Sequence, residues 1–201
     1  MESMNDLHAE ALLTFRELLD EARVCGDPEP TAMTLASCDA EGRVSARTVL
    51  LKAFDERGFV FYTNTESLKG RQLGEHPTCA LLFLWKRLHN QVQARIEGRA
   101  EPVSDGEADA YFASRPRPSQ IGAWASIQSE TLPSREAFEE RIARFEKEFE
   151  GRDVTRPPHW SGYRVVPQRI EFWYGVDYRL HDRDLYERSD DGDWSKRKLY
   201  P

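Results

Sequence analysis

The stretch that decides the fold is Arg47–Lys52 (RTVLLK), followed shortly by Phe59–Asn64 (FVFYTN). Both runs are rich in β-branched and aromatic residues, and Asp55-Glu56-Arg57-Gly58 lies between them, so they predict two strands joined by a short glycine-containing turn. Arg47 and Lys52 are an odd number of positions apart and are therefore expected on opposite faces of the sheet. An apolar strand with a cation at each end suits two separate anions, one on each side.

Runs of the same kind recur along most of the chain. Between Gln91 and Ala100 apolar residues alternate with polar ones, as on a strand with one buried face. Thr78–Leu84 is a continuous apolar run, which predicts a strand buried on both faces. Further strands are expected at Met33–Cys38, Val44–Ala53, Tyr163–Val166, Arg169–Trp173, Leu185–Glu187 and Trp194–Leu199. This pattern predicts a mainly β fold with peripheral helices, in which an antiparallel sheet closes into a barrel.

Helical patterns flank these strands. An N-terminal helix has the apolar spacing Leu12, Phe15, Leu19, with Asn5 or Asp6 as its expected cap and Gly26 as its stop. Ser104 and Glu107 have the spacing of a capping box. Other helices are expected at Ser67–Leu73, Ile121–Ser126 and Phe138–Phe149, whereas the prolines of Arg115–Gln120 predict a stiff loop. One domain is expected over residues 1–201, with the N-terminal helix (1–26), barrel strands (31–103), a helical insertion (104–150) and C-terminal strands (160–201).

Composition excludes several classes of protein. The chain of 201 residues has a formal net charge of -7, which argues against general nucleic-acid binding. No apolar run approaches the ~20 residues that span a bilayer, and the N-terminus lacks the features of a signal peptide. Cys25, Cys38 and Cys79 show no paired spacing, which predicts free thiols in a reducing cytoplasm. The histidines lack the spacing of metal ligands, so no metal site is expected.

Two groups of polar residues have the chemistry of a site for phosphorylated ligands, and a third, Arg179–Arg183, has four ionisable residues in five positions. The chain has no G-x-G-x-x-G and no P-loop signature, so a bound phosphate needs side-chain cations, for which Arg47 and Lys69 are candidates. Tyr111, Arg115 and Ser119, together with Lys52, offer two cations and two hydroxyls to a second phosphate. In Arg179–Arg183, alternate residues share one face if the segment is extended. Taken alone, each group is more often a solvated surface feature.

Four motifs in a fixed order resemble the pyridoxine (pyridoxamine) 5′-phosphate oxidases, FMN enzymes of vitamin B6 metabolism. The motifs are R-x-V-L-L-K at Arg47–Lys52, F-Y-T-N at Phe61–Asn64, S-R-P-R-x-S-Q-I-G-A-W at Ser114–Trp124 and R-L-H-D-R at Arg179–Arg183. They follow the family's order from about Thr31 to Pro201. The resemblance implies an FMN-binding split β-barrel and a homodimer with the flavin between the subunits.

The resemblance also implies roles for individual residues. Arg179 and His181 match residues at the substrate ring and are the expected catalytic pair, with Leu180 between them at the substrate. The substrate 5′-phosphate is expected at Lys52, Tyr111, Arg115 and Ser119. FMN is expected at Arg47, Thr48, Val49, Leu50, Leu51, Lys52, Tyr62, Thr63, Lys69, Gln91, Gln128, Ser129, Trp173 and Arg183.

Two departures from the family pattern accompany these matches. The family commonly has Arg-Lys where this chain has Leu68-Lys69, so one cation near the FMN phosphate is missing. The family often carries a basic, tyrosine-containing segment that closes over the substrate, and no Arg-Arg-x-Tyr stretch precedes the first helix here. Either that segment is absent or its role is taken elsewhere.

The function that the resemblance implies is oxidation of pyridoxamine or pyridoxine 5′-phosphate to pyridoxal 5′-phosphate. Dioxygen would accept the electrons and leave as hydrogen peroxide. One alternative keeps the fold and changes the substrate, as in relatives of phenazine biosynthesis or relatives that reduce flavins. A second alternative is a flavin-binding sensor or storage protein without turnover. Lys52 with Tyr111, Arg115 and Ser119 favours a phosphorylated substrate, because a substrate without phosphate has no need of this set.

Overall fold

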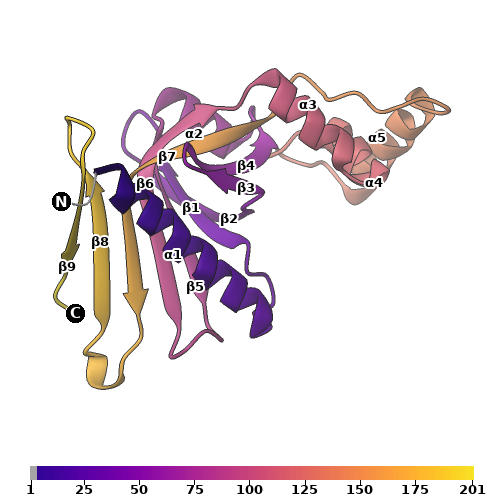
Figure 1. The fold of residues 1–201 in the computed structure, drawn as a ribbon. Coiled ribbons are helices and arrows are strands. Elements are labelled where there is room, and N and C mark those ends of the chain that lie inside the picture. Colours follow the sequence, from indigo (N-terminus) through magenta and orange to yellow (C-terminus); the bar gives the residue numbers. More distant parts are fainter. Residues whose placement is uncertain (1–3) are drawn as a thin grey trace.

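A computed structural model describes residues 4–201 as a curled nine-stranded sheet with five α-helices (Figure 1). The strands are β1 (Ala32–Cys38), β2 (Val44–Leu50), β3 (Ala53–Asp55), β4 (Gly58–Asn64), β5 (Thr78–Trp85), β6 (Val92–Pro102), β7 (Trp160–Tyr174), β8 (Asp182–Arg188) and β9 (Trp194–Lys198). The helices are α1 (Met4–Val24), α2 (Leu68–Glu75), α3 (Asp105–Ser114), α4 (Arg117–Ala125) and α5 (Arg135–Glu148), and a 3₁₀ turn, η1, covers Asp177–Arg179. The expected mainly β fold with peripheral helices is confirmed.

Sheet order explains how the barrel closes. The strands run β2-β1-β5-β6-β7-β4-β3, all antiparallel, with β8 also pairing with β7 and β9 with β8. The sequence neighbours β2 and β3 thus lie at opposite ends of the order. The link between them closes the curl, since the Lys52 N–H donates to the Val60 carbonyl at 2.8 Å. The prediction that Arg47–Lys52 and Phe59–Asn64 pair as a hairpin is wrong, because β2 pairs with β1 and the short hairpin is β3–β4.

Helix α1 fills the curl of the sheet with its apolar face. Phe15 is fully buried, and its ring meets those of Phe54, Phe59 and Phe83 edge-on at 4.9, 4.9 and 5.0 Å. Edge-to-face packing of this kind is the favoured geometry of aromatic pairs. The helix begins at Met4, so the predicted caps Asn5 and Asp6 lie inside its first turn. The N-terminal helix is thus a core element, as its apolar spacing indicates.

Two strand predictions need correction. The apolar run Thr78–Leu84 predicts burial on both faces, but in β5 buried residues alternate with partly exposed ones and Leu84 is 39% exposed. The predicted strands Tyr163–Val166 and Arg169–Trp173 are one continuous strand, β7. Pro167 does not divide it, because the register shifts opposite Glu97 and Gly98, and a bulge is a place where a strand tolerates proline.

Helices α3, α4 and α5 form an arm beside the barrel (Figure 1). The capping box of α3 is confirmed, since the Ser104 hydroxyl accepts the Glu107 N–H and the Glu107 carboxylate accepts the Ser104 N–H. The stiff loop predicted for Arg115–Gln120 is wrong, because α4 begins at Arg117. Pro116 and Pro118 lie at the start of this helix, where the missing N–H costs nothing. Phe112, Phe145 and Trp160 pack in the apolar cluster that joins the arm to β7.

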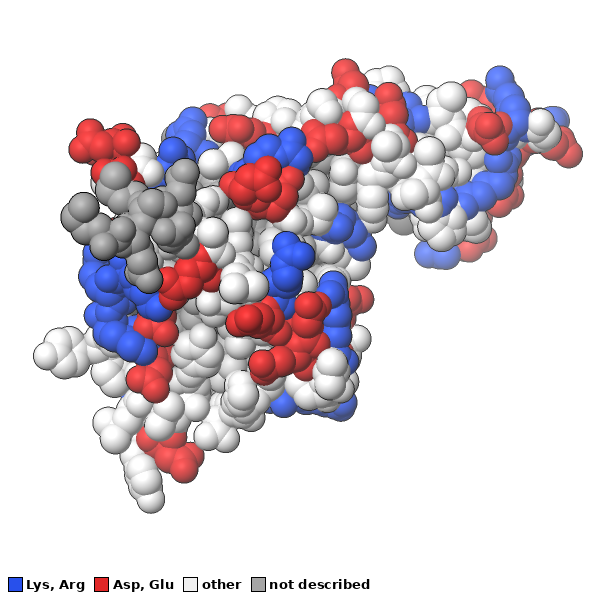
Figure 2. All heavy atoms as spheres, in the orientation of Figure 1, with Lys and Arg blue, Asp and Glu red and all other residues white. Residues whose placement is uncertain are grey.

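The surface carries mixed charge. On the face shown in Figure 2, acidic and basic side chains are interspersed instead of gathering into a field of one sign.

Among the described residues, no cluster of three or more His, Cys, Asp or Glu side chains has the geometry of a metal site. Within the same part of the chain, no helix combines the length and apolar character needed to cross a bilayer.

Candidate functional site

A cavity of about 870 Å³ lies where the barrel meets the arm. Strands β2 and β4 and the link after β2 form one side, and α2, α3, α4 and the start of β7 form the other. Many predicted site residues line it: Thr48, Val49, Leu50, Lys52, Tyr62, Thr63, Lys69, Tyr111, Arg115, Ser119 and Gln128. The expected FMN and substrate-phosphate residues therefore meet in one space.

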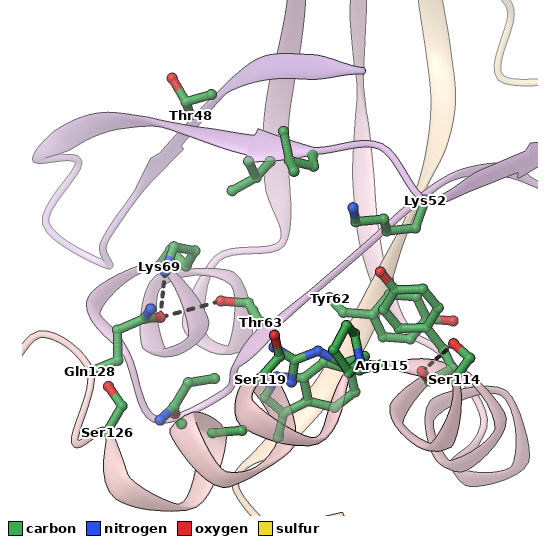
Figure 3. A pocket seen from close by; sticks show the side chains of 18 residues that line it. Thr48, Lys52, Tyr62, Thr63, Lys69, Ser114, Arg115, Ser119, Ser126 and Gln128 are labelled. Atoms are coloured by element: carbon green, nitrogen blue, oxygen red, sulfur yellow. Dashed lines mark hydrogen bonds between the residues drawn. The ribbon is translucent and has the colours of Figure 1, made fainter. Parts of the chain in front are cut away.

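Lys69 marks one end of the cavity (Figure 3). The Ser67 cap starts α2, and Lys69 in the first turn donates from Nζ to the Gln128 Oε1 at 2.8 Å. The Thr63 hydroxyl donates to the same Gln128 oxygen at 3.5 Å. Burial, and next the charge of Arg47, lower the pKa of Lys69. This ammonium is bound only to neutral oxygens in the described part of the chain, so it is available to an anion.

Arg115 marks the other end, where the arm faces the strands (Figure 3). Arg115 and Ser119 approach from the α3–α4 junction, while Lys52 reaches in from the end of β2. Burial lowers the pKa of the Arg115 guanidinium, and its Nη1 is buried without a hydrogen-bond partner among the described residues. An unpaired buried donor is costly, so this end of the cavity is prepared for an acceptor.

Aromatic rings support the Arg115 end. The rings of Tyr62, Tyr111 and Trp160 are nearly parallel, and the closest pair, Tyr62 and Tyr111, has centroids 4.0 Å apart. The Arg115 Cζ lies 4.9 Å from the centroid of Trp160. Gly162, which pairs with Tyr62 across the strands, makes room for this stack, because a Cβ there would lie 2.7 Å from the Tyr62 ring. We call Tyr62, Tyr111 and Trp160 the aromatic stack.

Arg47 lies beside the cavity and is absent from its lining. Its guanidinium donates to the Leu35 carbonyl at 3.2 Å, to the Ser37 hydroxyl at 2.6 Å and to the Gln72 Oε1 at 3.1 Å, and also to the Ser45 hydroxyl. All four acceptors are neutral, and burial lowers the pKa of Arg47. No carboxylate of the described residues pairs with this positive charge, which lies close enough to Lys69 to lower the pKa of the lysine. Leu51 is core, and the Ser129 hydroxyl accepts the Leu68 N–H at 3.1 Å beside Gln128.

The remaining predicted residues lie elsewhere, at the opposite end of β7. Trp173 and His181 pack with ring centroids 4.4 Å apart, and Gln91 precedes β6, whose first residue pairs with Tyr174. Arg183 donates from Nε to Glu171 at 2.8 Å, a bond that raises its pKa. Figure 1 shows η1, which ends at Arg179, at the tip of the sheet farthest from the arm. We call Gln91, Trp173, Arg179, Leu180, His181 and Arg183 the tip group.

The backbone of the tip group differs from its prediction. An extended segment before β8 would place Arg179, His181 and Arg183 on one face, but Tyr178 and Arg179 have φ values of 57° and 64°. That expectation is wrong for Arg179, whereas Arg183 does lie on β8. The Val176 N–H donates to His181 Nδ1 at 3.2 Å, which assigns the ring proton to Nε2.

Sequence reasoning missed several residues that line the cavity. They are Asn64, Ser114, Pro116, Gly122, Ala123, Ser126 and Trp160. Five of them, Asn64, Ser114, Pro116, Gly122 and Ala123, lie inside the motifs that resemble the family, but the resemblance implies no individual role for them. Trp160 lies outside these motifs and precedes the strand predicted at Tyr163–Val166, where a large aromatic residue favours a core role. It is buried, as such a role requires, yet one of its faces borders the cavity.

Comparison with protein families accounts for nearly the whole chain. Residues 18–148 match the family described as pyridoxamine 5′-phosphate oxidase. Residues 160–201 match the family described as the pyridoxine 5′-phosphate oxidase C-terminal dimerisation region. A pyridoxine/pyridoxamine 5′-phosphate oxidase of Xanthomonas euvesicatoria is 60% identical over 98% of this chain and 100% of its own length. The enzyme of the same name from Myxococcus xanthus is 56% identical over 93% of this chain and 89% of its own.

Solved structures show the same fold. PhzG from Burkholderia lata, crystallised with tetrahydrophenazine-1-carboxylic acid, aligns with a TM-score of 0.88 at 34% identity, covering 94% of this chain and 92% of PhzG. A pyridoxamine 5′-phosphate oxidase-related, FMN-binding protein from Nostoc punctiforme aligns at 0.67 and 19% identity over 100% of this chain and 98% of its own, which supports the fold alone. From its family matches and its 60% identity to named oxidases, this chain belongs to the pyridoxamine 5′-phosphate oxidase family, whose members are FMN-dependent oxidoreductases.

Proposed function

We propose that this protein oxidises pyridoxamine 5′-phosphate and pyridoxine 5′-phosphate to pyridoxal 5′-phosphate, with dioxygen as acceptor and hydrogen peroxide as product. The charge of the cavity is the observation that carries the proposal. Lys52, Lys69 and Arg115 line it, and no Asp or Glu does so within the described residues. Cations without acidic partners are what two phosphate-bearing ligands require.

The cavity also fits FMN. Its volume of about 870 Å³ lies within the range of ligand pockets, roughly 300–1,000 Å³. Lys69 would hold the FMN phosphate with Arg47 behind it, and the strand from Thr48 to Lys52 would run along the flavin. Tyr62, Thr63 and Gln128 would add hydrogen bonds. When bound, FMN supplies the two-electron acceptor that dioxygen reoxidises, chemistry that side chains cannot perform.

Two copies of the chain complete the proposed site. Trp160 lies at the cavity and Trp173 in the tip group, 13 residues apart on β7, or roughly 40 Å along the strand at about 3.3 Å per residue. One flavin cannot touch both ends of this strand. We therefore place the tip group of a second copy at the cavity, with the flavin between the subunits of a homodimer. The match of residues 160–201 to a dimerisation region supports this arrangement.

Each group then has a defined task. Arg115, Ser119, Tyr111 and Lys52 bind the substrate phosphate, which fixes the non-reacting end of the molecule. Arg179 and His181 of the second copy orient the pyridine ring, and the Nε2–H of His181 is a hydrogen-bond donor toward the substrate, since Nδ1 accepts the Val176 N–H. Trp173 packs against His181 and keeps its ring in place. The free thiols of Cys25, Cys38 and Cys79 are consistent with a cytoplasmic enzyme.

An absorbance spectrum tests the proposal most directly. The purified protein, supplied with FMN, is recorded without oxygen before and after addition of pyridoxamine 5′-phosphate. We expect the flavin band to bleach and to return with air, with formation of pyridoxal 5′-phosphate and hydrogen peroxide. A flavin band that does not bleach would reject oxidation of B6 phosphates and favour either a phenazine-type enzyme or a flavin-binding sensor or storage protein.

Similarity to PhzG, at 34% identity, favours one alternative, oxidation of a phenazine precursor. The residues that separate the two functions are Lys52, Tyr111, Arg115 and Ser119, which serve a phosphate monoester. Turnover of pyridoxine 5′-phosphate is therefore compared with that of unphosphorylated pyridoxine. A strong preference for the phosphorylated compound is expected, and equal rates would favour the alternative.

A further inference from the structure

The aromatic stack lies directly beneath the guanidinium that is proposed to bind the substrate phosphate. The Arg115 Cζ is 4.9 Å from the centroid of the Trp160 ring and 5.7 Å from that of Phe112. Phe112 meets Trp160 edge-on at 5.1 Å, so the indole is held from the side as well as by the parallel ring of Tyr62 at 5.3 Å. Trp160 is 6% exposed and cannot swing away from Arg115.

Arg115 has no other anchor in the described part of the chain. The arginines near it are held differently. Arg156 is paired with Asp105 and Asp109, and Arg117 donates to the Phe149 and Arg152 carbonyls. The side chain of Arg115 forms neither an ion pair nor a hydrogen bond with the described residues, and its buried Nη1 is unpaired. Among the described residues, this cation is thus held by aromatic faces, of which that of Trp160 is nearer than that of Phe112.

We propose that Trp160 is a positioning residue for the substrate phosphate, holding the Arg115 guanidinium over its ring so that the N–H groups stay free for the ligand. A carboxylate in this place would fix Arg115 equally well but would compete with phosphate for the same donors. A ring attracts the cation through its face and uses none of its hydrogen bonds. The inference rests on the proposed function, since it names a residue that tunes the proposed phosphate site.

The structure also explains why Trp160 takes this place. Trp160 opens β7 opposite Asn64, the last residue of β4. Its carbonyl accepts a hydrogen bond from Arg156 at 2.8 Å and its N–H donates to the Pro157 carbonyl at 3.0 Å. The backbone is therefore fixed on both sides, which sets the position of the indole before any ligand binds. Preorganised binding groups lose less entropy when a ligand arrives.

Calorimetric binding of pyridoxal 5′-phosphate and of inorganic phosphate to the FMN-loaded protein tests the inference. We expect Trp160→Leu to weaken pyridoxal 5′-phosphate binding about tenfold and Trp160→Phe, which keeps a smaller ring, about threefold. Steady-state assays should show the same change in KM with little change in kcat. Trp124→Leu is the matched control, because Trp124 packs on Phe145 and Phe149 in the same arm and does not line the cavity.

A double-mutant cycle separates positioning from general packing. In an Arg115→Ala background, Trp160→Leu should weaken binding less than about twofold, because the cation that the ring positions is gone. An equal loss in both backgrounds, or unchanged binding in Trp160→Leu, would overturn the inference. If the wild-type protein binds both probes through Arg115 and Trp160 but oxidises no B6 phosphate, the inference holds and the proposed function fails. If oxidation is normal and Trp160→Leu has no effect, the proposed function holds and the inference fails.

Discussion

The cavity and the tip group hold their functional residues by different means. Cavity residues are fixed within one chain: Lys69 by Gln128, Arg115 by the aromatic stack, and Tyr62 by the space that Gly162 leaves. In the tip group, Gln91, Arg179 and Leu180 are exposed, whereas Trp173, His181 and Arg183 are half-buried. Leu180 is 65% and Tyr178 93% exposed, and Val176, at 38%, adds a third apolar side chain to the same turn. Within the described residues, the cavity side chains therefore contact one another, whereas the turn before β8, at the other end of β7, leaves apolar side chains exposed.

Backbone strain is common to the two regions. Gln91 and Arg179 have φ values of 75° and 64°, and Ser129, beside the cavity, has 77°. Residues other than glycine adopt such values at a cost, and they do so most often at functional sites. Gln91, Arg179 and Ser129 are all exposed in one chain, so burial does not offset this cost in either region.

The largest expected effect comes from the cavity. Arg115→Ala should raise KM for pyridoxamine 5′-phosphate by about 10- to 150-fold, because a charge-assisted phosphate contact contributes roughly 1.5–3 kcal/mol. FMN should stay bound, since Lys69 and Arg47 are untouched. Steady-state kinetics measure KM, and the flavin spectrum measures how much FMN stays bound. Arg117→Ala is the control, as Arg117 lies two residues away with its donors committed to carbonyls. Unchanged saturation by substrate would exclude Arg115 as the anchor.

Mixing two defective chains tests whether the cavity and the tip group meet between subunits. Arg179→Ala should lower turnover while FMN is retained. Coexpression of Arg115→Ala and Arg179→Ala chains should restore about a quarter of the wild-type rate, because random pairing makes about half of the dimers mixed and each mixed dimer keeps one unaltered site. If both residues served the same site from one chain, every mixed site would stay defective. Absence of recovery in dimers verified as mixed would therefore contradict the shared site.

A smaller gain is expected at the edge of the cavity. Leu68 is 45% exposed in the first turn of α2, next to Lys69. Leu68→Arg would add the cation that the family commonly has there, and should tighten FMN binding roughly fivefold, the upper range for an exposed ion pair. The gain should shrink at high salt. Flavin fluorescence titration measures it, with the exposed Leu13→Arg on α1 as control. Equal tightening by both variants would mean that only net charge matters.

Local patterns in the sequence predict much of the molecule. The alternation in β6, the capping box of α3 and the apolar spacing of α1 each follow from neighbouring residues, and the structure has all three. Such local patterns do not predict which strands pair with one another. The apolar run at Arg47–Lys52 predicts a strand, but its partner depends on closure of the barrel, which local pattern does not encode.

The residues of the candidate site also differ in how far the sequence predicts them. Residues to which the resemblance gives a role, such as Lys52, Arg115 and Gln128, could be predicted to lie together, and they line one cavity. Trp160 could not be assigned to it, because a buried aromatic residue in a core and one beneath a cation look alike in sequence. The strained turn at Arg179 was equally hidden, since nothing in the residue types there demands a left-handed backbone.

The smallest expected effect is on the pH dependence of folding stability at the C-terminal strands. One of them, β8, carries Arg183 of the tip group and pairs with β9. His8 on α1 stacks on Trp194 of β9 with centroids 4.6 Å apart, and so ties the helix to the C-terminal strands. Burial, and next Arg188, lower the pKa of His8, against an opposing effect of Glu56. The unfolded chain then binds the His8 proton at higher pH than the folded one, so stability should fall as pH drops below about 6.5. Above that pH the contribution of His8 to the free energy of unfolding is fully present.

Thermal unfolding between pH 5 and 8 measures this dependence. His8→Gln, which cannot be protonated, should flatten the acid side of the curve relative to the wild type. Hydrogen exchange at the lower pH should increase first in β9 and α1 and leave β4 and α2 at the cavity protected, because the stack joins only the former pair. A uniform increase over all four elements would show that acid acts on the fold as a whole. The regions around the cavity and around the tip group would then have the same stability toward acid. The difference between the two regions would apply only to ligand binding.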